Sequence, residues 1–212
     1  MDAKTPEWFS DVTDAHIIKN YDAVNWAEEA DILVVGLGGA GVATALQGME
    51  NGLSVITLDK FSGGGATKAS GGVFYAGGGT QMQQDAGIKD TAEDMYNYLK
   101  LEVEDIVKPE TLKKFCDTSV ETFDWLVSNG VEFRSTYWPK KTSYPGPEYF
   151  LYHSDNTLVS NIRKQIPPSG RGHRGYVPIK QGRKAINLGG SIFDPLKETA
   201  LKKGMIHGAR QT

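Results

Sequence analysis

Residues 32–59, ILVVGLGGAGVATALQGMENGLSVITLD, carry the strongest structural signal in this chain. Its four leading apolar residues predict a buried strand, and the glycines that follow predict a tight turn into a helix. Asn51-Gly52 predicts the end of that helix, and Ser54 to Leu58 predicts a second buried strand. Strand, glycine turn, helix and strand in this order are typical of a dinucleotide-binding βαβ unit.

The small residues of this unit have separate tasks. Gly36 makes the turn off the first strand, and Gly38, without a Cβ, lets a pyrophosphate approach the backbone at the helix N-terminus. Gly41, with Ala45 one turn later, lets the helix lie close to the sheet. A glycine-rich turn that binds nothing is the alternative, and the agreement of all four elements disfavours it.

Asp59 ends the second strand, about 20 residues after the glycines, as a dinucleotide fingerprint requires. Its carboxylate is placed to accept hydrogen bonds from ribose hydroxyls and to repel a 2′-phosphate, so NADP is disfavoured. We therefore expect an adenine dinucleotide to be bound by Gly36, Gly38, Gly39, Ala40, Gly41, Asp59 and Lys60.

A second glycine-rich run, FSGGGATKASGGVFYAGGGT, occupies residues 61–80. Such a run can bring backbone N–H groups, with the Thr67 and Ser70 hydroxyls, around an extended polar ligand. A flexible linker is the alternative, but linkers seldom contain apolar residues such as Val73 and Phe74.

Together the two runs resemble the FAD-dependent oxidoreductase 2 family, which includes fumarate reductase flavoproteins and 3-ketosteroid dehydrogenases. GGATKASGG at residues 64–72 is similar to the GGxTxxSGG form of the ketosteroid dehydrogenases. The sequences of Gly71 to Thr80 and of Lys141 to Pro145 resemble those of the subgroup that acts at the 4,5 bond of 3-oxo-5-alpha-steroids.

The resemblance implies an α/β fold with a Rossmann-like FAD-binding domain of the glutathione reductase type. It also implies that the second run passes along the pyrophosphate and ribityl chain of FAD to the flavin ring. The implied contacts are Gly64, Gly65, Ala66, Thr67, Ser70, Gly71 and Gly72. The succinate dehydrogenase branch carries a histidine that bonds covalently to FAD here; residues 60–80 contain none, so we expect noncovalent FAD.

The expected organisation is an N-terminal extension, residues 1–29, followed by the first part of an FAD-binding domain, residues 30–212. In the resembled family a substrate cap domain and a C-terminal FAD segment come later. We therefore expect an incomplete domain that is inactive alone. Its expected parts are the dinucleotide fold and second glycine loop at 30–80, a helical segment at 91–130, a short strand at Val131–Phe133, a long loop region with little regular structure at 135–190, and a helix and the start of a returning strand at 191–212.

Composition excludes several other functions. A net charge of −3 does not favour nucleic acid as a partner. No apolar run approaches the length of about 18 residues that a membrane span needs, and the N-terminus lacks the features of a signal peptide, so we expect a cytoplasmic protein. Cys116 is the only cysteine and the four histidines are scattered, so no metal site is expected. The electron acceptor and the oligomeric state stay open.

The resemblance implies desaturation of a 3-ketosteroid, in which a base takes the proton alpha to the ketone and flavin N5 accepts a hydride. The family's base and enolate donors lie mostly in segments beyond this chain, so the catalytic residues are unassigned. Tyr144 and Tyr149 are candidates for the wall of the steroid pocket. Tyrosines that pack a loop with hydroxyls in water are the commoner alternative.

A cation-rich group between residues 171 and 184 offers a different interpretation. These side chains could receive the carboxylates of a fumarate-type ene reductase substrate or flank the FAD phosphates, but a solvated charged loop is favoured. The group is Arg171, His173, Arg174, Lys180, Arg183 and Lys184. A truncated, non-catalytic FAD-binding fragment is the third possibility.

Overall fold

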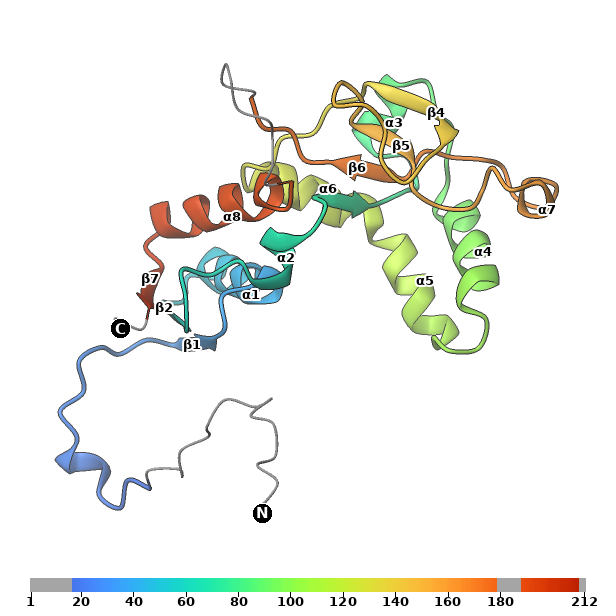
Figure 1. Ribbon diagram of the computed structural model, residues 1–212. Coiled ribbons are helices and arrows are strands. Elements are labelled where there is room, and N and C mark those ends of the chain that lie inside the picture. Colours follow the sequence, from blue (N-terminus) through green and yellow to red (C-terminus); the bar gives the residue numbers. More distant parts are fainter. Residues whose placement is uncertain (1–16, 179–187, 210–212) are drawn as a thin grey trace, which may run out of the picture.

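A three-stranded parallel sheet carries the βαβ unit in the computed structural model, which describes residues 17–178 and 188–209. Strands β1 (Ile32–Val35), β2 (Val55–Asp59) and β7 (Ile206–Ala209) lie in the order β1-β2-β7. Helix α1 (Gly39–Glu50) connects β1 to β2 (Figure 1). The Rossmann-like α/β fold predicted from the sequence is confirmed.

Close packing of α1 on the sheet depends on Gly41. A Cβ at this position would overlap the carbonyl oxygen of Gly36 and lie 3.3 Å from Cγ1 of Val34. Helix α8 (Gly190–Lys202) runs beside α1, as Figure 1 shows, and buries Phe193 and Leu196 in the same core. The core lies between the sheet and these two helices and continues through Phe123, Leu126 and Val131.

The opposite face of this sheet carries exposed apolar side chains. Because side chains alternate along a strand, the register of the three strands places Leu33, Val35, Leu58 and Ile206 on one face. These residues are 59%, 80%, 43% and 45% exposed. Parallel sheets are ordinarily covered on both faces, and within the described residues this face is uncovered.

The second glycine run contains structure that the sequence did not predict. Helix α2 (Gly65–Ala69) begins after Gly64, whose φ of 110° lies in the region that favours glycine. Strand β3 (Val73–Tyr75) follows, and then helix α3 (Gln81–Asp85), which begins at a capping box between Thr80 and Gln83. The run therefore consists of a short helix, a strand and a tight turn.

Three helices lie in the segment predicted to be helical: α4 (Ala92–Val103), α5 (Pro109–Asp117) and α6 (Ser119–Ser128). The strand predicted at Val131–Phe133 is wrong, because this segment forms a single isolated bridge from Phe133 to Gly175. A short 3-10 helix, η1 (Tyr21–Ala23), lies in the N-terminal segment.

A second sheet corrects the expectation of little regular structure after Ser135. Strands β4 (Tyr137–Lys141), β5 (Leu151–His153) and β6 (Gly172–Arg174) join β3 in the order β3-β6-β5-β4, and helix α7 (Ser160–Arg163) lies between β5 and β6. Every residue of β5 and β6 is buried, so neither strand has the polar alternation that identifies a half-exposed strand.

Candidate functional site

The first glycine turn leaves open space in front of α1. Gly36 has a φ of 94°, which turns the chain from β1 toward the helix. A Cβ on Gly38 would meet no atom of the described residues within 4 Å, unlike one on Gly41, which would overlap backbone. The N–H groups of the first helical turn have no intrahelical acceptor, and a helix N-terminus favours negative charge. This end of α1 can therefore receive an anionic group such as a pyrophosphate.

The second glycine run lies directly against this turn. The N–H of Gly64 donates to the carbonyl of Leu37 at 2.6 Å, and the N–H of Gly39 donates to the Thr67 hydroxyl at 3.2 Å. A Cβ on Gly65 would lie 3.9 Å from the Cα of Gly38. The structure thus brings together two glycine segments, residues 36–41 and 64–67, which the sequence separates by more than 20 residues.

Asp59 stabilises the first glycine turn through hydrogen bonds. Its two carboxylate oxygens accept the backbone N–H groups of Phe61 at 2.8 Å and Leu37 at 2.7 Å. These bonds, that from Phe61 first, lower the pKa of Asp59 below its ordinary value of 3.8. Each oxygen has a further acceptor position, so the carboxylate can also accept hydrogen bonds from a ligand. Lys60 beside it is exposed.

The hydroxyl of Ser70 holds the end of α2. It donates to the carbonyl of Thr67 at 2.8 Å and accepts the N–H of Gly72 at 3.2 Å. Gly71 lies against the hydroxyl of Tyr144, which a Cβ at Gly71 would overlap. The Tyr144 side chain is 52% exposed. The two hydroxyls predicted to face a ligand, those of Thr67 and Ser70, therefore both have protein partners.

The tail of the second run, residues 77–80, faces the protein interior. The N–H of Gly77 donates to the Ser119 hydroxyl at 3.0 Å, and that of Gly78 donates to Asp90 at 3.1 Å. The N–H groups of the next two residues share Oε1 of Gln83, at 3.0 and 3.1 Å. The tail, which lies beyond the last predicted contact at Gly72, therefore has its N–H groups bonded within the protein.

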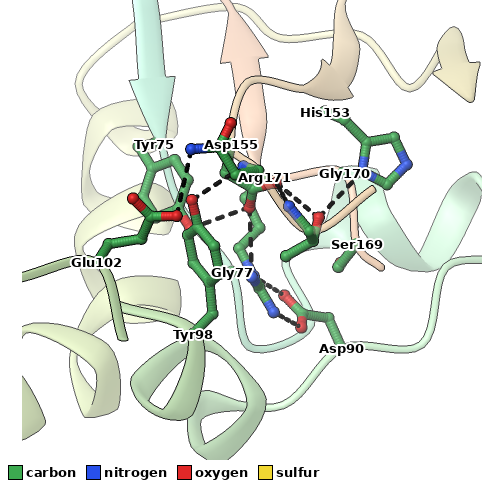
Figure 2. Close-up of polar contacts among 12 residues, drawn as sticks. Tyr75, Gly77, Asp90, Tyr98, Glu102, His153, Asp155, Ser169, Gly170 and Arg171 are labelled. Atoms are coloured by element: carbon green, nitrogen blue, oxygen red, sulfur yellow. Dashed lines mark hydrogen bonds and ion pairs between the residues drawn. The ribbon is translucent and has the colours of Figure 1, made fainter. Parts of the chain in front are cut away.

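Arg171 is fully buried and forms a charge cluster with two aspartates (Figure 2). Its Nε and Nη2 donate to the two oxygens of Asp90 at 3.0 and 2.7 Å, and its Nη1 donates to Asp155 at 3.3 Å. Burial acts to raise the pKa of Asp90, but the hydrogen bonds and charge of Arg171 outweigh it and hold that pKa below 3.8. Arg171 is therefore occupied by protein carboxylates.

His173 and Arg174 are buried as well. His173 donates from Nδ1 to the carbonyl of Arg171 at 3.0 Å, so its Nε2 accepts the Thr80 hydroxyl at 2.9 Å. Burial lowers the pKa of His173 to about 4. Arg174 donates to the carbonyls of Gly146 and Tyr149, both at 3.0 Å.

The solvated-loop interpretation is wrong for these three residues, because all of them are buried and hydrogen-bonded within the protein. None of the three side chains is placed to receive a ligand carboxylate. The other cations of the group, Lys180, Arg183 and Lys184, lie outside the described residues.

The two candidate tyrosines have different surroundings. Tyr144 reaches the second glycine run at Gly71, as described above. Tyr149 is half-buried, and its ring packs edge-on against Trp138 with centroids 4.9 Å apart. The structure therefore places only Tyr144 against the glycine run.

An open groove of about 770 Å³ lies elsewhere, between α1 and α6. Its lining includes Thr44 and Gln47 of α1 and Trp125 of α6. It is apart from the glycine turn at the N-terminus of α1. In the described ranges no group of three His, Cys, Asp or Glu side chains could hold a metal ion. No helix found there combines the length and apolar character needed to cross a membrane.

Comparison with known proteins identifies the protein family of this chain. Residues 31–190 match the family described as FAD binding domain. The chain belongs to this family. FAD is therefore the cofactor, and the open space at Gly38 beside the N-terminus of α1 fits its pyrophosphate.

Two curated relatives represent the two branches of the resemblance. A 3-oxo-5-alpha-steroid 4-dehydrogenase from Comamonas testosteroni is 39% identical over 194 residues, which are 89% of this chain and 34% of that protein. An NADH:fumarate oxidoreductase from Klebsiella pneumoniae is 34% identical over 103 residues, which are 48% of this chain and 11% of that protein. The predicted kinship with steroid dehydrogenases and fumarate reductases is confirmed.

A solved structure shares the fold. The crystal structure of 3-ketosteroid-delta4-(5alpha)-dehydrogenase from Rhodococcus jostii RHA1, in complex with 4-androstene-3,17-dione, superposes with a TM-score of 0.80 at 32% identity. The match covers 89% of this chain and 39% of the Rhodococcus chain. This chain thus spans about a third of the length of the steroid dehydrogenases it matches.

Proposed function

We propose that this chain is the FAD-binding portion of a flavin oxidoreductase that desaturates a 3-ketosteroid, with FAD held noncovalently. The observation that carries the proposal is the contact between the two glycine runs at the N-terminus of α1, where Thr67 joins Gly39. The second of these runs contains the GGxTxxSGG motif. The steroid named for the Comamonas and Rhodococcus relatives supports the substrate class.

The residues of the first run would hold the adenosine and pyrophosphate part of FAD. Gly38 admits the pyrophosphate to the N–H groups of α1, and the positive end of the helix dipole stabilises its charge. Asp59 keeps the turn in place through Leu37 and accepts the ribose hydroxyls with its remaining acceptor positions. The other first-run contacts in this proposal are Gly36, Gly39, Ala40, Gly41 and Lys60.

The residues of the second run would extend the site toward the flavin ring. Thr67 fixes this run to α1, and the Ser70 hydroxyl fixes the turn to Gly72. The remaining contacts proposed in this run are Gly64, Gly65, Ala66 and Gly71. When bound, FAD supplies the acceptor for the hydride removed from the substrate.

Tyr144 is the better of the two proposed substrate-pocket residues, because its exposed phenol lies at Gly71, the flavin side of the site. Tyr149 would contribute indirectly, through its packing on Trp138. A ketosteroid is favoured over a dicarboxylate, because Arg171, His173 and Arg174 are occupied within the protein. The base that removes the alpha proton is not assigned to any residue of this chain.

The cofactor proposal is tested by incubating the purified chain with FAD and removing free flavin by gel filtration. We expect flavin absorbance to travel with the protein and to be released on denaturation, since the linkage is noncovalent. A colourless protein after gel filtration would contradict the proposed cofactor site.

The substrate class is tested on the FAD-loaded protein under anaerobic conditions. A saturated 3-ketosteroid should bleach the flavin absorbance, and succinate should leave it unchanged. The reverse result would support the fumarate-type alternative and contradict the proposed substrate.

A further inference from the structure

Arg171 lies at the centre of a charge cluster outside the cofactor site. The guanidinium is 0% exposed and donates to two carboxylates, Asp90 and Asp155. It also lies over the ring of Tyr98, 5.6 Å from the centroid. Figure 2 shows these groups converging from α4 and from the segments that precede α4, follow β5 and precede β6.

Stability alone is a poor explanation for this cluster. It buries one cation with two carboxylates, and each charge loses its hydration. Buried ion pairs can often be replaced by apolar residues of similar volume without loss of stability. The backbone segments that the cluster contacts therefore indicate whether it fixes their positions.

The cluster holds the end of β3 from three directions. The N–H of Ala76 donates to the carbonyl of Arg171 at 2.9 Å, and the hydroxyl of Tyr75 donates to Asp155 at 3.2 Å. Burial raises the pKa of Tyr75, so this hydroxyl keeps its proton and remains a donor. Asp90 accepts the N–H of Gly78 in the turn that follows. A shift of β3 by one residue along β6 would break all three bonds.

Space around the turn is equally restricted. A Cβ on Gly77 would lie 2.6 Å from Oδ2 of Asp90 and 3.0 Å from Nε of Arg171. The backbone at Gly77 therefore lies directly against the cluster.

The other end of β3 is the cofactor site. Val73 pairs with Arg174 on β6, and the N–H of Gly175 donates to the carbonyl of Gly72 at 3.0 Å. Gly72 has a φ of 67° and leaves no room for a Cβ beside Leu188. Only three residues of strand separate this glycine from the cluster, so the register of β3 sets the position of residues 70–72.

We infer that Arg171 is a positioning residue for the flavin end of the cofactor site. With Asp90 and Asp155, it fixes the register of β3 on β6 and thereby places Ser70 to Gly72 along the ligand. This inference rests on the proposed function, because it requires FAD to extend along the second glycine run. The βαβ unit, which would bind the adenosine half, is held by its own contacts.

The experiment compares FAD with ADP, which would occupy only the adenosine half of the site. Arg171→Lys keeps the charge and loses the paired hydrogen bonds to Asp90. We expect this variant to bind ADP within about twofold of the wild-type affinity and FAD about tenfold more weakly. Lys113→Gln, which removes an exposed ion pair with Asp117 on α5, is the control and should bind both ligands like the wild type.

A purely structural role predicts a different pattern. Equal weakening of ADP and FAD, or unchanged FAD affinity, would overturn the inference. Asp155→Asn provides a second variant if Arg171→Lys does not fold, because it retains the bonds between Arg171 and Asp90. This variant should also bind FAD more weakly while its affinity for ADP stays near that of the wild type. If neither variant gives a cooperative thermal transition, the cluster serves stability and the inference is wrong. A wild-type chain that binds ADP and FAD with equal affinity would also overturn it, whereas one that binds neither would contradict the proposed function itself.

Discussion

Gly38 and Gly41 lie one helical turn apart, yet the structure predicts opposite consequences for the same substitution. A Cβ on Gly38 would enter open space, and its φ of −91° suits alanine. A Cβ on Gly41 would overlap the carbonyl oxygen of Gly36 and approach its carbonyl carbon at 3.1 Å. Gly38→Ala should therefore impair binding, and Gly41→Ala should impair folding.

The magnitudes follow from these contacts. Gly38→Ala loses only the small N-cap preference for glycine over alanine, about 1 kcal/mol or less, so the Tm should fall by less than about 4 °C. Gly41→Ala gains about 1 kcal/mol in helix propensity. Overlap with the carbonyl of Gly36, which cannot rotate away, costs about 3 kcal/mol. The net loss of about 2 kcal/mol corresponds to a Tm lower by about 4 to 8 °C.

The binding prediction concerns Gly38→Ala, whose methyl group would occupy the approach of the pyrophosphate. An overlap of about 1 to 3 kcal/mol weakens FAD by roughly 5- to 150-fold. Thermal unfolding followed by circular dichroism and fluorescence titration with FAD measure the two effects. Wild-type FAD affinity in Gly38→Ala would refute the assigned approach of the ligand. Equal loss of Tm in both variants would refute the contrast in packing.

Three further predictions test other parts of the site. Asp59→Ala should weaken FAD by about 1 to 3 kcal/mol in calorimetric titration, and unchanged affinity would indicate a different ribose partner. Thr67→Val should weaken FAD by about 1 kcal/mol through loss of the bond to Gly39, while Thr67→Ser retains it; equal affinities of the two variants would contradict this role. Burial lowers the pKa of His173 from 6.5 to about 4, so between these values the unfolded chain binds a proton that the folded chain does not. Stability should therefore fall as the pH drops through this window, by at most about 1.4 kcal/mol per unit from this group, and urea unfolding at pH 7 and 5 should show a smaller loss in His173→Gln than in the wild type.

The βαβ unit was predictable because its signals are local. The apolar run of β1, the glycines after it and the stop at Asn51-Gly52 each act on neighbouring residues. The contact between Gly41 and Gly36 spans only five residues, and it is the contact that a dinucleotide fingerprint encodes.

The second sheet was not predictable for a physical reason. Strands β5 and β6 have three residues each and are buried throughout, so they carry no alternation of polar and apolar side chains. Strand β4 contains a proline and two lysines, which disfavour a strand assignment. Pairing with distant partners, rather than local preference, determines these strands.

The charge cluster was missed for a related reason. Asp90 and Arg171 are 81 positions apart, and no local pattern links them. A cation-rich sequence ordinarily indicates a solvated loop, and the structure instead places Arg171 between two carboxylates. The partners of the GGG at residues 77–79, which are Ser119, Asp90 and Gln83, were likewise not indicated by any local pattern.

We propose that FAD lies across both glycine runs and not along the tail of the second. Amide hydrogen exchange of the chain, measured with and without FAD, is the decisive test of this placement. We expect FAD to slow exchange at residues 36–41 and 64–72 and to leave residues 77–80 unchanged, since the N–H groups of that tail already bond to Ser119, Asp90 and Gln83. Protection confined to the groove between α1 and α6, or to residues 77–80, would contradict it.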